Sequence, residues 1–435
     1  MMGLDGFDWE RGLGSPTLGG EHAFTPDYSE SLPYFRDISD EVLTIQRGIG
    51  KLTMAAKPER SRVAILWAPY NHYISRCLPF EENGFSGTWM SNVSVIGGAV
   101  SDSLSLLQSL QLRPTMVAPE DVIHGDLERR GFKVLVLPYN KGMSTAEAAA
   151  IRRFVAAGGL VIADNDPATY SQHGRKLKEP ALADLFPVTD RMHTQAHGKG
   201  QAIYLPNMIN GYTSRLEKDD YTGAEVVQAL LARYADERPA YQLLGPGGQP
   251  RYDTLTRSFR HGKTTLLGLL RAQTPAAEKP VAAVLKLNEK QHAWDLRQAK
   301  YLGYIDAIPV SLDQEAKFLA LLPEKPVSID LAARDPKAGG TGLAITAGSR
   351  LELTGRVGFS GETHGTDIGQ AVHCRVFGPG GKELEWFRQN IVFQGATFPL
   401  VLPLSQSAKV GSYRVVVEHA LSGTVGETVF QIRKP

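Results

Sequence analysis

Residues 134–165 read VLVLPYNKGMSTAEAAAIRRFVAAGGLVIADN, and this stretch decides the fold of the first half of the chain. Two short apolar runs, 134–137 and 160–163, flank a segment in which Ile151, Phe154 and Val155 recur at helical spacing. Ser144 and Glu147 have the spacing of a capping box, and Gly158-Gly159 supplies a left-handed stop. The stretch therefore predicts a strand–helix–strand unit, the repeating unit of a parallel sheet flanked by helices.

The same alternation of strands and helices extends from about residue 62 to 235. Apolar runs at 63–67, 115–118 and 202–205 predict further strands, and apolar stripes at 100–110 and 226–231 predict further helices. After Pro239 the helical period fades, and short runs recur between turns rich in glycine and proline, which indicates all-β structure. A linker-like stretch at 333–342 divides this β region into two units.

The first 58 residues differ from the rest because they are acidic and have little periodic apolar sequence. Apolar residues at helical spacing predict a helix over 38–49, and the preceding stretch 12–33 has the composition of a loop. Such a segment has too few apolar residues to form a core of its own. We therefore expect it to pack on another part of a protein.

Composition excludes several classes of protein. The 435 residues carry a formal net charge of +1, so no bulk attraction to nucleic acid or anionic lipid is expected. No apolar run approaches the length needed to span a bilayer, and the N-terminus has no features of a signal peptide. The two cysteines, Cys77 and Cys374, do not form a disulfide framework. The compartment is not specified by the sequence and is taken as cytoplasmic by default.

Two short motifs resemble ligand sites. Gly262-Lys263-Thr264 resembles the end of a P-loop, but it lies between β-runs, so a hairpin turn is the better interpretation. His193 and His197 are four residues apart, a spacing that can share a metal on a helix. No third ligand falls at a matching interval, and glycines follow at once, so we predict a polar loop, no metal and no cofactor.

Polar clusters follow three of the predicted strands. In an open parallel sheet, ligands bind beyond the carboxyl ends of the strands. A site at that edge would combine a base, a cation and amide donors, whereas the alternative is that the same groups cap turns. The candidate residues are Asn71, His72, Tyr139, Lys141, Asp164, Asn165, His173 and Arg175.

A second set of candidates lies near the N-terminus, where Asp8 and Glu10 flank Trp9. If this run is a strand, both carboxylates lie on one face. Two carboxylates held across a glycosidic bond can hydrolyse it, but neighbours on one strand are poorly placed to straddle a sugar. We interpret these acids as a hydrogen-bonding rim or as surface.

The stretch 134–165, followed by Tyr170, His173-Gly174-Arg175 and Leu185-Phe186, resembles the middle domain of family 42 glycoside hydrolases, the beta-galactosidase trimerisation domain. The resemblance covers about residues 62–235 and implies a class I glutamine amidotransferase-like fold. The runs GLDGFDWERG (3–12) and EVLTIQRGIGKL (41–52) resemble the closing strand and final helix of the catalytic barrel in the same family. The C-terminal region resembles the β-sandwich extensions of larger members.

The resemblance also implies what is missing. An active amidotransferase has a nucleophilic cysteine where this chain has Ala163-Asp164-Asn165, so glutamine hydrolysis is not expected. The catalytic glutamates of the glycosidase family lie on barrel strands upstream of the last one, so no catalytic residue is assigned here. Trp9 resembles the aromatic residue that lines the sugar pocket.

We therefore expect an α/β plus all-β architecture. It comprises the last βα unit of a (β/α)8 barrel as a remnant (1–58), a flavodoxin-like parallel-sheet domain of the amidotransferase type (59–238), a small β-sandwich (239–334) and an Ig-like β-sandwich (340–435). The expected function is that of a non-catalytic C-terminal portion or subunit of a beta-galactosidase-like enzyme, which provides assembly surface and one edge of a sugar pocket. The implied partners are further copies of the chain, as a trimer, or a separate barrel-bearing chain, with carbohydrate as ligand. The alternatives are an autonomous hydrolase that uses the strand-end crevice and a carbohydrate-binding protein.

Overall fold

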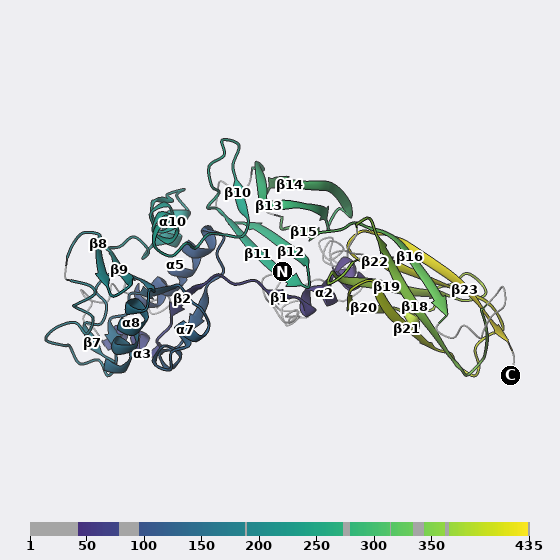
Figure 1. The fold of residues 1–435 in the computed structure, drawn as a ribbon, viewed down its shortest axis with the longest axis horizontal. Coiled ribbons are helices and arrows are strands. Elements are labelled where there is room, and N and C mark those ends of the chain that lie inside the picture. Colours follow the sequence, from purple (N-terminus) through teal and green to yellow (C-terminus); the bar gives the residue numbers. More distant parts are fainter. Residues whose placement is uncertain are drawn as a thin grey trace, which may run out of the picture.

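The computed structural model describes residues 42–77, 95–187, 189–272, 279–313, 315–333, 343–361 and 365–433. Three units follow one another along the chain and lie in a row, with the parallel-sheet domain at one end and the C-terminal β-sandwich at the other (Figure 1). The N-terminal candidates Asp8, Trp9 and Glu10 lie outside the described residues. None of the described helices is long and apolar enough to cross a membrane.

The first unit is a six-stranded sheet in the order β3-β2-β4-β6-β9-β8, parallel except for the edge strand β8. Its strands are β2 (Val63–Leu66), β3 (Thr115–Val117), β4 (Val134–Pro138), β6 (Leu160–Asp164), β8 (His193–His197) and β9 (Gly200–Leu205). Its helices are α3 (Pro69–Cys77), α5 (Val95–Ser109), α6 (Pro119–Ile123), α7 (Asp126–Arg129), α8 (Thr145–Ala156), α9 (Tyr212–Leu216) and α10 (Thr222–Tyr234). The short strands β5 (Gly142–Met143) and β7 (Tyr170–Ser171) form a separate pair.

Both faces of this sheet are covered, which explains why its strands are continuous apolar runs rather than alternating ones. Leu135 and Leu137 pack with α8 on one face, whereas Val134 and Val136 pack with α5 and α10 on the other. The predicted capping box is confirmed, because Glu147 N–H donates to Ser144 Oγ (3.1 Å) and Ser144 N–H donates to Glu147 Oε2 (2.8 Å). The predicted strand–helix–strand unit is therefore present.

The polar loop predicted around His193 and His197 is wrong. These residues form β8, which pairs antiparallel with β9 across a two-residue turn. The exposed edge of β9 supplies hydrogen-bonding partners for a segment whose composition alone resembles a loop. The two histidines lie at the ends of this edge strand.

The second unit is one seven-stranded antiparallel sheet in the order β1-β11-β12-β15-β13-β10, with β14 paired to β13. Its strands are β1 (Lys57–Pro58), β10 (Gln242–Leu244), β11 (Thr254–His261), β12 (Thr264–Arg271), β13 (Val281–Asp295), β14 (Lys300–Leu312) and β15 (Lys317–Leu322). The predicted turn at Gly262-Lys263 is confirmed as the hairpin between β11 and β12.

A single curled sheet takes the place of the two facing sheets expected for residues 239–334. A register shift in the β13–β14 pairing between Lys286 and Gln291 divides β13 into two parts. The first part pairs with β10, and the second pairs with β15, so the sheet folds back over its own apolar residues. Irregularities of this kind bend and twist a sheet. The types of the flanking residues do not predict such an irregularity here.

The third unit is a β-sandwich, as expected for the C-terminal region. One sheet has the order β16-β18-β21 and the other β17-β23-β22-β19-β20, with a shared core between them. The strands are β16 (Pro326–Ala333), β17 (Leu343–Thr346), β18 (Arg350–Phe359), β19 (Gly369–Phe377), β20 (Gln389–Gln394), β21 (Thr397–Pro403), β22 (Gly411–His419) and β23 (Val425–Arg433), with a short helical turn η3 (Glu385–Phe387). Because β16 pairs with β18, residues 326–333 belong to this sandwich, and the expected boundary at 334 falls inside the unit.

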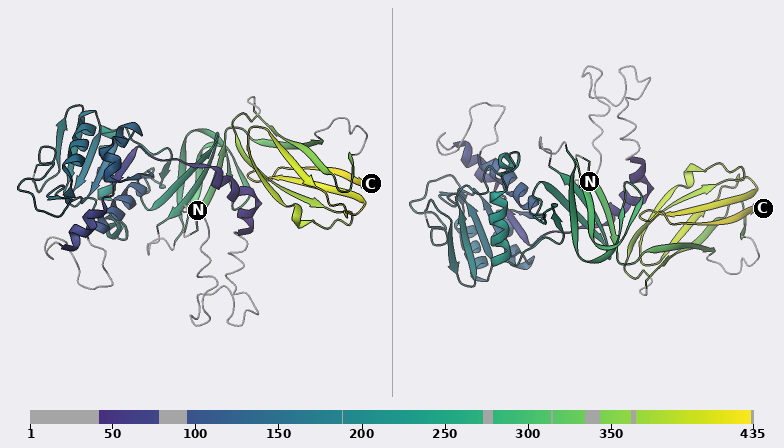
Figure 2. Two further views of the ribbon diagram at one scale, coloured as in Figure 1. Left: turned by 90° about the horizontal axis from the view of Figure 1, so that it is seen from below. Right: turned by 90° about the horizontal axis from the view of Figure 1, so that it is seen from above.

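The helix expected near the N-terminus continues further than predicted, as a π-helical turn η1 (Ile45–Ile49) followed by α2 (Gly50–Ala55). It lies between the second and third units (Figure 2). Ile49 and Leu52 are buried in a core that also contains Phe259 and Trp294 of the curled sheet. Lys51 Nζ donates to the carbonyl oxygen of Asn390 in the sandwich (2.7 Å). The segment therefore packs on the later units of the same chain.

Candidate functional site

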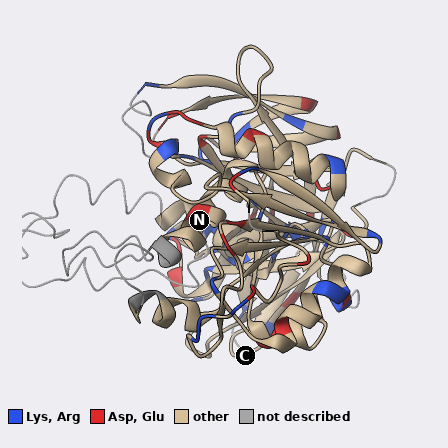
Figure 3. Ribbon diagram, turned by 90° about the vertical axis from the view of Figure 1, so that its left-hand side faces the viewer, with Lys and Arg blue, Asp and Glu red and all other residues tan. Residues whose placement is uncertain are grey.

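The strand-end clusters of the parallel sheet are held by different sets of contacts, and each candidate side chain has its own surroundings. Charged residues of both signs are interspersed over this domain, so the edge does not lie in a field of one sign (Figure 3). The geometry of each cluster decides whether its groups are available to a ligand.

Asn71 is a structural residue. It lies in the first turn of α3, is 3% exposed, and accepts a hydrogen bond from Gly142 N–H at 2.6 Å. Its Nδ2 donates to the carbonyl oxygen of Gly142 at 3.2 Å. A Cβ on Gly142 would meet Ile74 Cδ1 at 2.3 Å, so a larger residue here would require the Ile74 side chain to shift. The amide predicted as a ligand group is used to join two loops.

His72 lines a pocket of about 500 Å³ at the carboxyl ends of β2 and β4. Trp67 and Tyr73 form exposed parts of its wall, and Asn140 lies in its lining. Asn140 is 2% exposed, and its Oδ1 atom has no hydrogen-bond partner among the described residues. The sequence places Asn140 in the polar cluster that follows β4, but no local pattern shows that its acceptor lacks a partner, because turn-capping asparagines are common in such loops.

Tyr139 and Lys141 contact each other rather than an open site. Tyr139 has a φ of +53°, which turns the chain sharply after β4. The Lys141 side chain is buried, and its Nζ lies 5.0 Å from the centroid of the Tyr139 ring. Neither residue lines the pocket beside His72.

Asp164 accepts hydrogen bonds from three successive backbone N–H groups, those of Met208 and Ile209 at 3.2 Å and that of Asn210. Burial raises the pKa of Asp164 to about 6, although these hydrogen bonds and the nearby Arg215 act in the opposite direction. The carboxylate therefore fixes the loop after β9. Its raised pKa reflects the low polarity of its surroundings.

Asn165 follows Asp164 at a φ of +64°, and its Nδ2 is buried without a partner among the described residues. His173 and Arg175 lie in an exposed loop after β7. The Nε2 atom of His173 lies 3.1 Å from Gln172 Nε2, and Arg175 N–H donates to Ser171 Oγ at 3.2 Å. None of the three lines the pocket beside His72, so the structure does not bring the eight candidates into one site.

Sequence reasoning missed the contact between Tyr70 and Glu147. The Tyr70 hydroxyl donates to Glu147 Oε1, while Glu147 Oε2 caps α8. Burial, followed by the Glu147 carboxylate, raises the pKa of Tyr70. The capping box identifies Glu147 as a cap, but no sequence signal links it to a tyrosine 77 residues away.

The buried carboxylates of the described chain all have structural partners. Asp102 accepts from the N–H groups of Gly211 and Thr213, at 2.6 and 3.0 Å. Glu237 binds Arg62 at 2.8 Å, and Asp253 binds Arg271 at 2.8 Å. Glu147, Asp164 and Glu324 are also buried, and each accepts a hydrogen bond from a backbone N–H group. Across the described ranges, no group of three or more His, Cys, Asp or Glu residues is arranged to hold a metal ion.

Comparisons with known proteins bear on the fold. No family model matches the sequence, and no curated protein matches it. Among solved structures, the chain is similar to a catalytic mutant of Gan42B, a GH42 beta-galactosidase from G. stearothermophilus, with a TM-score of 0.50 and 13% identity over 69% of this chain and 45% of that chain. The beta-galactosidase from Bacillus circulans sp. alkalophilus gives a TM-score of 0.47 and 14% identity over 69% and 47% of the two chains.

A third similar structure is the beta-galactosidase of the haloarchaeon Halorubrum lacusprofundi, with a TM-score of 0.44 and 11% identity over 68% of this chain and 44% of that chain. At 13% identity, the likeness to the Gan42B mutant is one of fold alone. The chain spans less than half the length of each of these three beta-galactosidases.

Proposed function

We propose that this chain acts as a non-catalytic portion of a beta-galactosidase-like glycoside hydrolase, in which it provides assembly surface and one edge of a sugar pocket. The fold similarity to a GH42 beta-galactosidase, with a TM-score of 0.50, supports the relationship to glycoside hydrolases. The five parallel strands have the order β3-β2-β4-β6-β9, which is the flavodoxin-like order 2-1-3-4-5 and supports the amidotransferase-like interpretation of residues 59–238.

The contacts of the buried acids are the observation that supports a non-catalytic role. Glycoside hydrolysis needs two carboxylates that flank an open substrate site. In the described chain, Asp102 and Asp164 accept backbone N–H groups, while Glu237 and Asp253 bind arginines. A carboxylate held by such contacts is committed to stability and cannot approach a glycosidic bond without breaking them.

We propose that the N-terminal segment is the remnant of a (β/α)8 barrel. η1 and α2 would be the final helix of a (β/α)8 barrel, and Trp9, with Asp8 and Glu10, would form the edge of the sugar pocket. The burial of Ile49 and Leu52 against the curled sheet supports the idea that this helix joins a barrel to the β units. A barrel strand needs neighbours on both sides, so the remaining strands would come from another part of the enzyme.

Assembly can be tested by sedimentation velocity of the purified chain over a range of concentrations. The proposal expects a concentration-dependent oligomer, with a trimer as the form that the resemblance implies. A chain that stays monomeric at all concentrations, and that does not associate with a barrel-bearing glycosidase chain, would refute the assembly role.

An autonomous hydrolase in the strand-end crevice is less well supported. The pocket beside His72 joins the loops after β2 and β4 but contains no residue of the 164–166 cluster. Asp164, whose pKa is raised by burial, faces the backbone of residues 208–210 instead.

Carbohydrate binding by the β units is the second candidate, and one aromatic cluster favours it. His292 and Trp294 on β13 lie beside Tyr301 and Tyr304 on β14, with His292 and Tyr304 ring centroids 4.7 Å apart. Tyr304 is 54% exposed. Binding of the full chain to a glycan array, lost on Tyr304→Ala, would support this function, and an array without binding would remove it.

A further inference from the structure

The parallel sheet has a topological switch point between β2 and β4. In the order β3-β2-β4-β6-β9, the chain runs from β2 outwards to β3, crosses back to β4 on the other side of β2, and continues to β6 and β9. Helix α5, which follows β2, packs on one face of the sheet through Leu106 and Leu107. Helix α8, which follows β4, packs on the other face through Ile151 and Phe154. Loops that diverge in this way leave a crevice at the carboxyl ends of the strands, where ligands bind in doubly wound folds.

The pocket beside His72 lies at this switch point. Its lining comes from the end of β2, the end of β4 and helix α5, and comprises residues 66–69, 71–73, Pro138, Asn140, Val100 and Ser101. Its volume of about 500 Å³ falls within the range of about 300–1,000 Å³ that is usual for small-molecule sites. The pocket therefore has both the position and the size of a ligand site.

Hydrogen bonds within the chain fix the walls of this pocket. Trp67 N–H donates to the carbonyl oxygen of Val117 in β3 at 2.9 Å, which holds the backbone at the end of β2. Asn71 joins the start of α3 to Gly142 in the loop after β4 through two hydrogen bonds. Because the loops on both sides are held in this way, the pocket needs little reorganisation to accept a ligand.

The side chains in the lining indicate the chemistry of the ligand. Trp67 is 52% exposed and Tyr73 is 66% exposed, so both rings offer accessible surface at the pocket. The His72 ring lies edge-on to Tyr73, with the centroids 6.1 Å apart. His72 and Ser101 carry hydrogen-bonding groups, and none of the described residues that line the pocket is Asp, Glu, Lys or Arg. Such a lining favours an uncharged ligand with an apolar face and polar groups at its edge.

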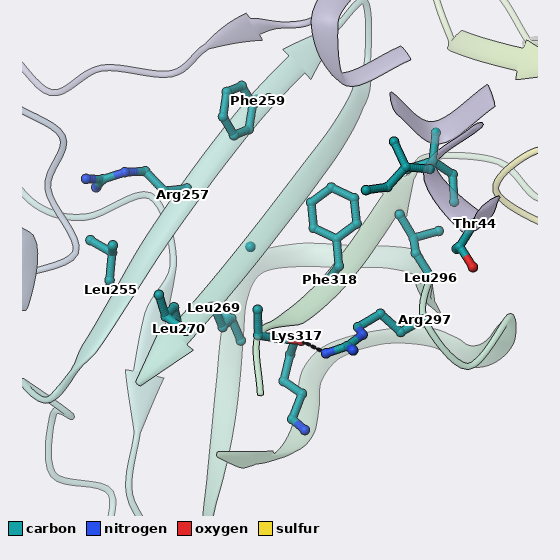
Figure 4. A pocket seen from close by; sticks show the side chains of 14 residues that line it. Thr44, Leu255, Arg257, Phe259, Leu269, Leu270, Leu296, Arg297, Lys317 and Phe318 are labelled. Atoms are coloured by element: carbon teal, nitrogen blue, oxygen red, sulfur yellow. Dashed lines mark hydrogen bonds between the residues drawn. The ribbon is translucent and has the colours of Figure 1, made fainter. Parts of the chain in front are cut away.

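The pocket between η1 and the curled sheet differs in size and in lining. It has a volume of about 170 Å³ and is surrounded mainly by apolar side chains, such as Leu255, Leu270 and Phe318 (Figure 4). Arg297 in its lining donates through Nη1 to the carbonyl oxygen of Ala316 at 2.9 Å, so this charged group is used within the chain. We interpret this second pocket as a gap in the packing between the N-terminal helix and the sheet.

We propose that the pocket beside His72 binds a neutral pyranose sugar, with the Trp67 and Tyr73 rings against the sugar and His72 and Ser101 towards its hydroxyl groups. A pyranose has C–H groups on its faces and hydroxyl groups at its edge, which matches this lining. A phosphorylated or carboxylated ligand would lose hydration without gaining a counter-charge. The site is separate from the aromatic cluster on β13 and β14 and does not depend on the proposed role in a glycoside hydrolase.

The test is titration of the full chain with methyl β-galactoside, methyl β-glucoside and glucuronate, followed by saturation-transfer difference NMR. We expect saturable binding of at least one neutral glycoside and none of glucuronate in the same concentration range. Trp67→Ala and Tyr73→Ala should each weaken binding about tenfold, because each removes an aromatic contact. Trp386→Ala is the matched control, because Trp386 is also exposed (75%) but lies on the sandwich, and it should bind like the unmodified chain.

Tyr304→Ala separates this site from sugar binding by the β units. Binding that is lost on Tyr304→Ala but kept on Trp67→Ala would place the sugar on the curled sheet and overturn the proposal. Equal binding of glucuronate, or no saturable binding of either glycoside, would also overturn it. A crystal of the unmodified chain soaked in the tighter-binding glycoside tests the location without a variant. The sugar should contact Trp67 and Tyr73, and a sugar found only elsewhere would contradict the proposal.

Discussion

Asn71 and Gly142 exchange two hydrogen bonds across 71 residues of sequence: Gly142 N–H donates to Asn71 Oδ1, and Asn71 Nδ2 donates to the carbonyl oxygen of Gly142. The amide thereby acts as a piece of β-strand that joins the start of α3 to the loop after β4. The same residue lines the pocket at the carboxyl ends of β2 and β4. At the edge of the sheet where a ligand is expected, the Asn71 amide, which could bind that ligand, instead holds two parts of the chain together.

Replacing Asn71 by alanine should destabilise the parallel-sheet domain by about 2–3 kcal/mol, because two buried backbone groups lose their partner. Urea unfolding of the variant measures the loss. The exposed His173→Ala variant serves as control and should change stability by less than about 0.5 kcal/mol. Equal stability of the two variants would show that the Asn71 contacts are not formed in solution.

Asp164 should make the domain more stable in acid than at neutral pH. Its pKa in the folded chain is about 6, above the ordinary 3.8, so the folded state binds the proton more tightly. The stabilisation from this group is complete below about pH 4 and is lost as the pH rises through 6, a change of about 3 kcal/mol. The stability difference between the unmodified chain and Asp164→Asn should follow that course in urea unfolding from pH 4 to 7.5. A difference that is constant with pH would contradict it.

His419 should make the sandwich less stable in acid than at neutral pH. It is fully buried, and burial lowers its pKa to about 3. The unfolded chain therefore takes up the proton first, and stability present above pH 6.5 is lost as the pH falls towards 3, by about 2 kcal/mol at pH 5. In His419→Asn, the amide oxygen can accept from Ser422 as Nδ1 does now, and the acid sensitivity should decrease. Identical acid unfolding of the two proteins would argue against a buried neutral histidine.

Two glycines of the curled sheet should respond differently to alanine. Gly262 has a φ of +56°, and a Cβ there would meet the carbonyl oxygen of Asp367 at 2.0 Å. Gly262→Ala should therefore cost about 2 kcal/mol or more through strain and displacement of the sandwich. A Cβ on Gly268 meets Phe318 at 3.8 Å, an ordinary contact, so Gly268→Ala should be nearly neutral. Thermal unfolding of both variants decides whether the sheet and the sandwich are in contact as described.

Local sequence predicted the parallel-sheet domain well, because its signals are short in range. The capping box at Ser144 and Glu147 and the apolar stripe of α8 lie within one helix, and each is present where expected. The turn at Gly262-Lys263 is equally local. Such features depend on the spacing of a few neighbouring residues and not on the rest of the fold.

Long-range pairing was not predictable in the same way. β8 forms because β9 offers an open edge, and β16 joins the sandwich across the segment that looks like a linker. The curl of the second unit depends on a register shift within β13 that its composition does not mark. At the strand ends, the sequence placed polar residues correctly but could not tell that Asn71 and Asp164 are satisfied by backbone groups.

The proposal that this chain is framework rather than catalyst can be checked by steady-state hydrolysis of aryl β-galactosides by the purified chain. We expect no turnover above the rate in buffer, and the same result for Asp8→Asn and Glu10→Gln. Robust turnover that either substitution abolishes would contradict it, because it would assign the chemistry to acids interpreted here as a rim.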